Sequence, residues 1–332
     1  MTYQNLVDAI GNTPLLKLKR ASEETGCTIL GKAEWMNPGG SVKDRAAKEI
    51  IENAEAAGLL KPGATIVEGT AGNTGIGIAH VASAKGYKTL IVIPETQSEE
   101  KKNAIRLAGA TLKQVPAKPY KDPDNFIHVS ERIAKQMNED NPGSALWANQ
   151  FDNTANRDAH IKTTGPEIWQ QTSGKVDGFV CSVGSGGTLA GMAMYLRSKN
   201  PDIKIGLVDP YGANLFNYYT KGELSNEGSS IMEGIGQIRI TKNLEGFKPD
   251  FAYRATDAEA LSSLYQLADE EGMPLGGSSG INLIGAMKLA KDLGPGHTIV
   301  TILCDSMGRY MSKIGDKAFM DSKELPTPRW AV

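Results

Sequence analysis

The sequence has few of the residues that would hold a fold together by disulfides or bind a metal. Its 332 residues include three cysteines, at positions 27, 181 and 304, and four histidines. The cysteines are far apart and form no CxxC pair, so neither a disulfide framework nor a zinc knuckle is expected. The histidines form no HExxH motif and no close group with carboxylates. No metal site is therefore predicted.

The chain also lacks a strong charge bias and a long apolar run. Its 36 basic and 38 acidic side chains give a formal net charge of −2, which indicates no general affinity for nucleic acid or an anionic membrane. No run of about 18 apolar residues occurs, so no membrane span is expected. Residues 1–5 have neither the basic nor the apolar region of a secretory signal. These absences favour a cytoplasmic protein.

What is present is a regular alternation of strands and helices. Short apolar, β-branched runs at 65–68, 88–95, 177–183, 204–208 and 297–303 are separated by longer helical patterns. Near-continuous apolar strands that alternate with helices predict parallel sheets covered on both faces. The length suggests about two domains. The expected fold class is therefore α/β, with two domains that each contain a mainly parallel twisted sheet flanked by helices.

A lysine lies where one helix is expected to begin. The stretch NPGGSVKDR at 37–45 contains a proline and two glycines that end the preceding strand, and Ser41 is a candidate N-cap. Lys43 then falls in the first helical turn, where the helix dipole disfavours the ammonium form. Such a lysine is suited to act as an amine nucleophile and form a Schiff base. The simpler interpretation is a surface lysine paired with Asp44.

Three glycine-rich turns each precede an expected helix, and those at 68–75 and 184–188 also follow an expected strand. The turn at 68–75 lacks the Walker A lysine and the GxGxxG spacing, and its N–H groups and hydroxyls suit a small anion such as a carboxylate. The turn at 184–188 has small residues, two hydroxyls and no positive charge, which suits a phosphate. The turn at 276–280 is weak on its own. For each, an ordinary structural turn is the alternative.

Together these stretches resemble the β-family (fold type II) of pyridoxal-phosphate (PLP) enzymes, and within it the cysteine synthase (O-acetylserine sulfhydrylase) branch. The similarity runs in order along nearly the whole chain, over 11–15, 37–45, 71–75, 162–169, 184–188, 233–236 and 276–280. The resemblance implies PLP as the cofactor and a fold similar to the tryptophan synthase β-subunit.

The resemblance also implies a role for each site residue. Lys43 is expected to form the Schiff base with PLP, and Asn73 to hydrogen-bond the oxygen of the ring hydroxyl. Ser278 is expected to face the pyridine nitrogen, and Gly234 to flank the entrance for the substrate. The phosphate is expected on Gly184, Ser185, Gly186, Gly187 and Thr188. The α-carboxylate of the amino-acid substrate is expected on Thr70, Ala71, Asn73, Thr74 and Gln150.

The implied reaction is a β-replacement of cysteine biosynthesis, catalysed by a transferase. O-acetyl-L-serine would lose acetate, an α-aminoacrylate intermediate would remain on the cofactor, and sulfide would add to give L-cysteine, with Lys43 as the general base. Cystathionine β-synthase, which joins serine or O-acetylserine to homocysteine, is a close alternative, and threonine/serine dehydratase is a more distant one. An inactive scaffold is an alternative of another class, although the retained Lys43, Asn73 and Ser278 argue against it.

Two positions depart from the family pattern. Ala71 stands where the asparagine loop usually has a serine, so one hydroxyl is missing from the expected carboxylate site and the preferred substrate is left open. Glu68-Gly69 replaces the common Glu-Pro, which should make this turn more flexible.

The resemblance further implies domain limits and partners. The N-terminal α/β domain is expected over 1–12 and 36–153, with a part around 95–140 that moves on substrate binding. The C-terminal domain, which binds the PLP phosphate, is expected over 13–35 and 154–322, and an extended tail over 323–332. The expected partners are the amino-acid substrate, sulfide and a second copy in a homodimer. The C-terminal tail of serine acetyltransferase is a further candidate.

Overall fold

The computed structural model describes residues 2–70 and 72–331, so Ala71 lies outside the described residues. The chain divides into two compact units, each built from two separate pieces of sequence. The first unit consists of Met1–Gly11 and Asn37–Ala159, and the second of Asn12–Met36 and His160–Val332. The segment at 12–36 therefore belongs with the C-terminal half of the chain.

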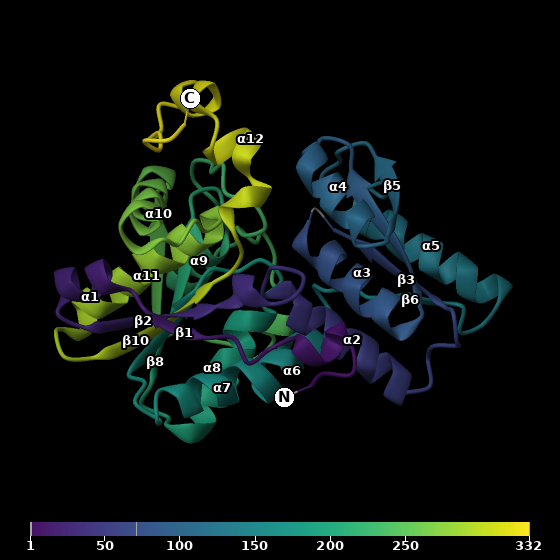
Figure 1. The fold of residues 1–332 in the computed structure, drawn as a ribbon, viewed down its shortest axis with the longest axis horizontal. Helices are drawn as coiled ribbons and strands as arrows, with labels where there is room; N and C mark the ends of the chain where they lie inside the picture. Colours follow the sequence, from purple (N-terminus) through teal and green to yellow (C-terminus); the bar gives the residue numbers. More distant parts are fainter. Residues whose placement is uncertain (1, 71, 332) are drawn as a thin grey trace. The chain divides into compact units, whose positions relative to one another are not determined.

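The first unit contains a four-stranded parallel sheet in the order β5-β4-β3-β6. Its helices α2 and α3 pack against each other, and α5 packs against β3 and β6 (Figure 1). In chain order its elements are η1 (Leu6–Ala9), α2 (Lys43–Ala56), β3 (Thr65–Gly69), α3 (Asn73–Lys85), β4 (Lys88–Pro94), α4 (Glu99–Leu107), β5 (Thr111–Val115), α5 (Phe126–Asp140), β6 (Ala145–Trp147) and α6 (Ala155–Ala159).

The second unit contains a six-stranded sheet in the order β1-β2-β10-β7-β8-β9, in which β1 runs antiparallel to β2 and the other described pairs are parallel. The strands are β1 (Leu15–Lys17), β2 (Thr28–Ala33), β7 (Gly178–Cys181), β8 (Lys204–Pro210), β9 (Phe251–Ala255) and β10 (Thr298–Leu303). The helices are α1 (Lys19–Thr25), η2 (Glu34–Met36), the π-helix η3 (His160–Thr164), α7 (Gly165–Gln171), α8 (Gly187–Lys199), α9 (Leu215–Lys221), η4 (Lys242–Leu244), α10 (Asp257–Glu271), α11 (Gly277–Leu293), η5 (Met307–Arg309), α12 (Met311–Ile314) and α13 (Lys317–Asp321).

Each sheet is covered by helices that bury apolar side chains. In the first unit Ile50 of α2, Ile66 of β3 and Ile78 of α3 belong to one buried cluster. In the second unit α11 lies close to the sheet, because a Cβ on its Gly285 would lie 2.6 Å from a methyl of Val208. The predicted α/β class, with two mainly parallel sheets flanked by helices, is confirmed.

Some local predictions differ from the structure. Helix α11 begins at Gly277, so the glycine-serine turn expected at 276–280 forms its first turn. The N-cap of α2 is Val42 rather than Ser41, although the Ser41 hydroxyl accepts a hydrogen bond from the Lys43 N–H at 3.3 Å. Both differences arise because glycine and serine tolerate helical and turn conformations alike. Among the described residues, no helix is long and apolar enough to cross a membrane.

Gly69, the residue that replaces the family's proline, lies in a tight contact. It is the last residue of β3, and a Cβ added there would lie 2.7 Å from the Phe126 carbonyl oxygen and 2.8 Å from the Ile127 Cα. The start of α5 thus approaches the backbone of β3 too closely for any side chain. This contact is a steric reason for glycine at position 69.

We predict that Gly69→Ala lowers the free energy of unfolding by about 1–3 kcal/mol, because the new methyl group meets rigid backbone rather than a mobile side chain. Gly308→Ala is the matched control, because nothing lies within 4 Å of a Cβ there and its φ is not left-handed. Urea denaturation monitored by circular dichroism measures both variants. Equal stability of the two variants would contradict the steric explanation.

Candidate active site

Lys43, the lysine predicted to carry the cofactor, lies in the first unit. Lys43 is the first residue of α2 and is half-buried. Its Nζ makes no hydrogen bond or ion pair with residues 2–70 and 72–331, whereas its backbone N–H donates to Ser41. A half-buried amine without a partner among the described residues is placed to act as a nucleophile.

The simpler interpretation of Lys43, a pair with Asp44, does not fit the observed contacts. Asp44 is 1% exposed and accepts a hydrogen bond from the backbone N–H of Gly39. A Cβ on Gly77 of α3 would lie 3.1 Å from Asp44 Oδ1. Adjacent helical residues do not face each other. Asp44 therefore holds the preceding loop and lies against α3, while the side chain of Lys43 points elsewhere.

The asparagine loop lies at the start of α3. Asn73 is the first residue of this helix, and the N–H of Gly72 donates to the Thr70 hydroxyl at 3.3 Å. The Thr74 hydroxyl donates to Oε1 of Gln150 at 2.6 Å, although 76 positions separate the two residues in sequence. The structure thus brings Thr70, Asn73, Thr74 and Gln150 to one end of the first sheet. Of the predicted carboxylate set, Ala71 lies outside the described residues.

A buried carboxyl lies beneath this loop. Glu68 of β3 is 1% exposed, and its Oε1 lies 3.4 Å from the backbone nitrogen of Gln150. Burial raises the pKa of Glu68 to about 8, and hydrogen bonds from the backbone of Gln150 and Asn149 and from the Gln150 side chain only partly offset this rise. The sequence alone indicates no separate role for Glu68.

The predicted phosphate loop forms the start of α8 in the second unit. Gly186 is the N-cap with a φ of +92°, and a Cβ there would lie 2.7 Å from Leu244. Ser185 and Gly187 are buried, and no side chain of the described residues caps this helix terminus. The first N–H groups of α8 therefore keep their capacity to bind an anion.

Three residues that the sequence analysis did not single out fix this loop. The Thr188 hydroxyl lies 3.1 Å from Nε2 of His160, in the π-helix η3. The Thr241 hydroxyl donates to the carbonyl of Ser185 at 2.8 Å, and the Gln237 amide donates to the carbonyl of Gly184 at 2.7 Å. The signal for His160 was its position just before the Lys162-to-Trp169 motif. Thr241 and Gln237 carry no comparable signal.

Ser278 and Gly234 also lie in the second unit. Ser278 lies in the first turn of α11, is 8% exposed, and its hydroxyl has no partner among the described side chains and backbone groups. Gly234 is exposed with a φ of +78°, and a Cβ on Gly184 would meet its carbonyl oxygen. Gly184 and Gly234 are therefore neighbours, which brings the predicted entrance residue next to the phosphate loop.

These residues fit PLP. A phosphate needs N–H donors without competing caps, and the start of α8 has them. A Schiff base needs an amine that no ion pair or hydrogen bond holds elsewhere, and the Lys43 Nζ has no partner among the described residues. The hydroxyl of Ser278 is a donor and acceptor that suits a ring nitrogen. The described residues contain no group of three His, Cys, Asp or Glu that could hold a metal ion.

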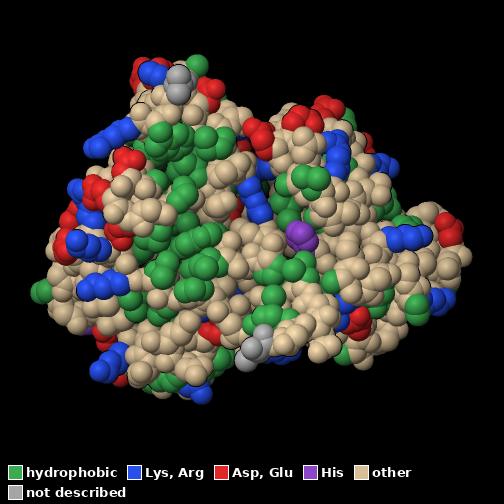
Figure 2. Space-filling view, in the orientation of Figure 1, with side chains coloured by type: hydrophobic (Ala, Val, Ile, Leu, Met, Phe, Trp, Pro, Cys, Tyr) green, Lys and Arg blue, Asp and Glu red, His purple; other side chains and the backbone are tan. Residues whose placement is uncertain are grey.

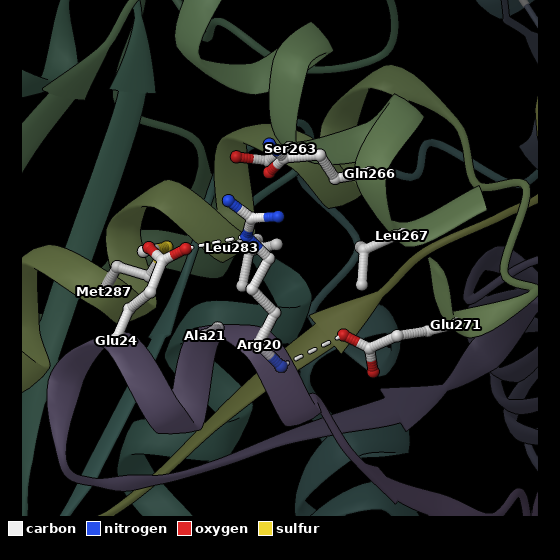
Figure 3. Close-up of a pocket in the computed structure, with 9 residues that line it drawn as sticks. All are labelled: Arg20, Ala21, Glu24, Ser263, Gln266, Leu267, Glu271, Leu283 and Met287. Carbon is white, nitrogen blue, oxygen red and sulfur yellow. Dashed lines mark hydrogen bonds and ion pairs between the residues drawn. The ribbon is translucent and has the colours of Figure 1, made fainter. Parts of the chain in front are cut away.

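A separate pocket in the second unit contains none of the predicted site residues. Figure 3 shows Arg20 of α1 beside Glu24, with its backbone nitrogen directed at Glu271 of α10. The floor is apolar and includes Leu267 and Leu283. Arg20 forms ion pairs with the exposed side chains of Glu24 and Glu270, and such exposed pairs contribute little stability.

The comparisons with known proteins decide the family. The model of the family described as "Pyridoxal-phosphate dependent enzyme" matches residues 6–305. The chain belongs to this family. It is 50% identical to cysteine synthase 1 of Neurospora crassa over 97% of this chain and 86% of that one, and 51% identical to cysteine synthase 1 of Emericella nidulans over 96% and 86%.

Cystathionine beta-synthases are also similar to this chain. Cystathionine beta-synthase of Apis mellifera is 39% identical over 98% of this chain and 64% of that one. The crystal structure of an O-acetylserine dependent cystathionine beta-synthase from Helicobacter pylori superposes with a TM-score of 0.85 at 34% identity, over 94% of this chain and 98% of that one. The predictions of a fold type II enzyme and of PLP as its cofactor are confirmed.

The buried carboxyls predict how stability depends on pH. The pKa of Glu68 is raised from 4.5 to about 8 and that of Asp209 in β8 from 3.8 to about 7, in both cases mainly by desolvation. The folded chain therefore binds these protons more tightly than the unfolded chain. Their contribution to stability is complete below about pH 4 and is lost as the pH rises to about 8.

We expect Glu68→Gln and Asp209→Asn each to reduce this loss, by on the order of 2 kcal/mol at the upper end of the window. The measurement is urea denaturation of wild type and both variants at several pH values between 4 and 8. Variants whose difference from wild type stays constant across that range would show that neither carboxyl changes its pKa on folding.

Proposed function

We propose that this chain forms L-cysteine from O-acetyl-L-serine and sulfide by PLP-dependent β-replacement, and that Lys43 carries the cofactor. The observation that carries the proposal is the half-buried Lys43 at the start of α2, whose amine has no partner among the described residues. Identities of 50% and 51% to two fungal cysteine synthases support the choice of reaction.

The first unit supplies the groups that act on the amino acid. The α-carboxylate is held by Thr70, the N–H groups at the start of α3 and the amide of Gln150, with Ala71 and Asn73 as the remaining predicted members. These neutral donors bind an anion without a counter-charge. The amine of Lys43 removes the proton from Cα and later returns it. Bound PLP supplies the electron sink that makes this proton acidic.

The second unit supplies the groups that hold and tune the cofactor. The N–H groups of residues 184–188 and the dipole of α8 would bind its phosphate, with Thr188 oriented by His160. Ser278 would face the ring nitrogen. A hydroxyl there, unlike a carboxylate, does not force protonation of the ring, which favours loss of a β-substituent over transamination. Gly234, next to the phosphate loop, would flank the entrance.

Synthesis of cystathionine is the second candidate function. The structure of the O-acetylserine dependent cystathionine beta-synthase from Helicobacter pylori supports it, because the two chains superpose with a TM-score of 0.85 at 34% identity. The same residues would bind the first substrate, and only the sulfur nucleophile would differ. The higher identity to cysteine synthases favours sulfide.

Further properties belong to the same proposal. The N-terminal domain would comprise 1–12 and 36–153 with a mobile part at about 95–140, and the phosphate-binding domain 13–35 and 154–322 with a tail at 323–332. The protein would be cytoplasmic and homodimeric, with the tail of serine acetyltransferase as a candidate partner. Figure 2 shows hydrophobic side chains gathered on the visible face of the second unit, which supports an interface on that face.

We predict that Lys43→Ala abolishes the visible absorption band of the bound cofactor and lowers turnover by at least about 10³-fold, because no other amine can take over both roles. Lys88→Ala, at an exposed position at the start of β4, is the control and should change neither. Absorption spectra and a cysteine assay measure the two effects. A Lys43→Ala protein with the wild-type band and rate would overturn the assignment.

A comparison of sulfide with homocysteine as the second substrate identifies the sulfur nucleophile. With O-acetylserine as first substrate, we expect kcat/KM for sulfide to exceed that for homocysteine by at least about tenfold, since the chain is more similar to cysteine synthases. Mass spectrometry identifies the product of each reaction. A preference for homocysteine, or for serine as first substrate, would favour cystathionine synthesis instead.

A further inference from the structure

The buried carboxyl of Glu68 has no part in the chemistry above. It lies in β3, between β4 and β6, and one of its oxygens has no hydrogen-bond partner among residues 2–70 and 72–331. No cation contributes to the electrostatics of this carboxyl. A buried carboxyl without a cation lowers stability. The contact that the carboxyl does make is through its other oxygen, Oε1, which accepts from the backbone N–H of Gln150.

Oε1 of Glu68 faces a strained turn. Asn149, just after β6, has a φ of +49°, which is unfavourable for a residue other than glycine. Its carbonyl accepts hydrogen bonds from Asp152 at 3.1 Å and Asn153 at 2.8 Å, and the Asn156 amide donates to the Gln150 carbonyl at 2.8 Å. The N–H groups of Asn149 and Gln150 turn the other way, toward Glu68.

This arrangement also orients the side chain of Gln150. Backbone N–H groups only donate, so the Glu68 oxygen that faces them is an acceptor whether or not the carboxyl is protonated. The side-chain amide of Gln150 lies near enough to Glu68 to lower its pKa, while Oε1 of Gln150 accepts from the Thr74 hydroxyl at 2.6 Å. With Oε1 turned to Thr74, Nε2 is the end of the amide that can face Glu68. An amide nitrogen carries two hydrogens. One can meet Glu68 while the other binds a carboxylate oxygen of a ligand.

We propose that Glu68 is a positioning residue, which holds the Asn149–Gln150 turn and selects the orientation of the Gln150 amide that binds the α-carboxylate of the amino-acid substrate. The inference rests on the proposed function, because it takes Gln150 as part of the carboxylate site. Loss of Glu68 would let the amide rotate and present Oε1, which repels a carboxylate.

The experiment compares three substitutions in the holoenzyme at neutral pH. Glu68→Gln keeps an acceptor oxygen on a side chain of the same length. Glu68→Asp shortens the side chain by one methylene, so that its oxygen lies farther from the turn. Glu68→Met has a similar volume but no acceptor oxygen. We expect the KM for O-acetylserine at saturating sulfide to stay within about threefold of wild type for Gln and to rise about tenfold or more for Met, with Asp between. The kcat should change less than KM.

A second readout does not need turnover. The Kd of L-serine, measured by titrating the cofactor absorbance of the holoenzyme, should follow the same order. Thr89→Val is the matched control, because Thr89 is a buried polar residue of the same sheet whose hydroxyl has no partner among the described residues. It should leave KM and Kd at wild-type values. Should Glu68→Met fail to fold, the Glu68→Asp and Glu68→Gln pair tests the same order.

The possible results separate the two levels of inference. A wild-type protein that binds no PLP or no amino acid would overturn the proposed function, and the role of Glu68 with it. An active wild type with equal KM and Kd in all Glu68 variants would overturn only the role of Glu68. So would a fall in kcat with KM and Kd unchanged, because that pattern indicates altered packing around the reacting groups.

Discussion

The unsatisfied N–H groups at the start of helices are the constraint on which the site depends. Helices α4, α5 and α10 meet this demand with side-chain caps from Ser98, Asn125 and Thr256. The helices α1 and α9 receive carboxylates from distant positions, Glu271 and Asp209. Helices α3, α8 and α11 have no side-chain cap in the part of the chain that is described, and all three begin with predicted ligand residues. A helix start without a side-chain cap can bind an anion, which suits the phosphate predicted at α8.

The sequence predicted those features that follow from local chemistry. Apolar runs identified β3, β4, β7, β8 and β10. Glycine-rich turns marked the starts of α3 and α8. Features that depend on distant contacts were not predictable. Strand β9 is only partly buried, and the hydrogen bonds from Thr241 and Gln237 to the phosphate loop span more than 50 positions of sequence. The start of α11 was placed too late because Gly and Ser have low helix propensity.

Two buried carboxyls, Glu68 and Asp209, could not be expected from their sequence neighbours. By composition alone, Glu68 and Asp209 would be expected at the surface. Each instead accepts backbone N–H groups, in one case from a left-handed turn and in the other from the start of α9. Such carboxyls cost stability and fix backbone that would otherwise have several conformations. The departures from the family pattern lie in the same region. Gly69 is explained by the approach of α5, whereas Ala71 lies outside the described residues.

The division of the chain into discontinuous units has a consequence for its biosynthesis. All the strands of the first sheet have been made once residue 159 has left the ribosome, so this unit can fold early. Strand β2, by contrast, pairs with β10, and Thr28 has to wait for Thr298. Until then the edge of β2 that does not face β1 remains unpaired and can associate with other chains. Nascent chains that stall between these two points would be the form of this protein most in need of a chaperone.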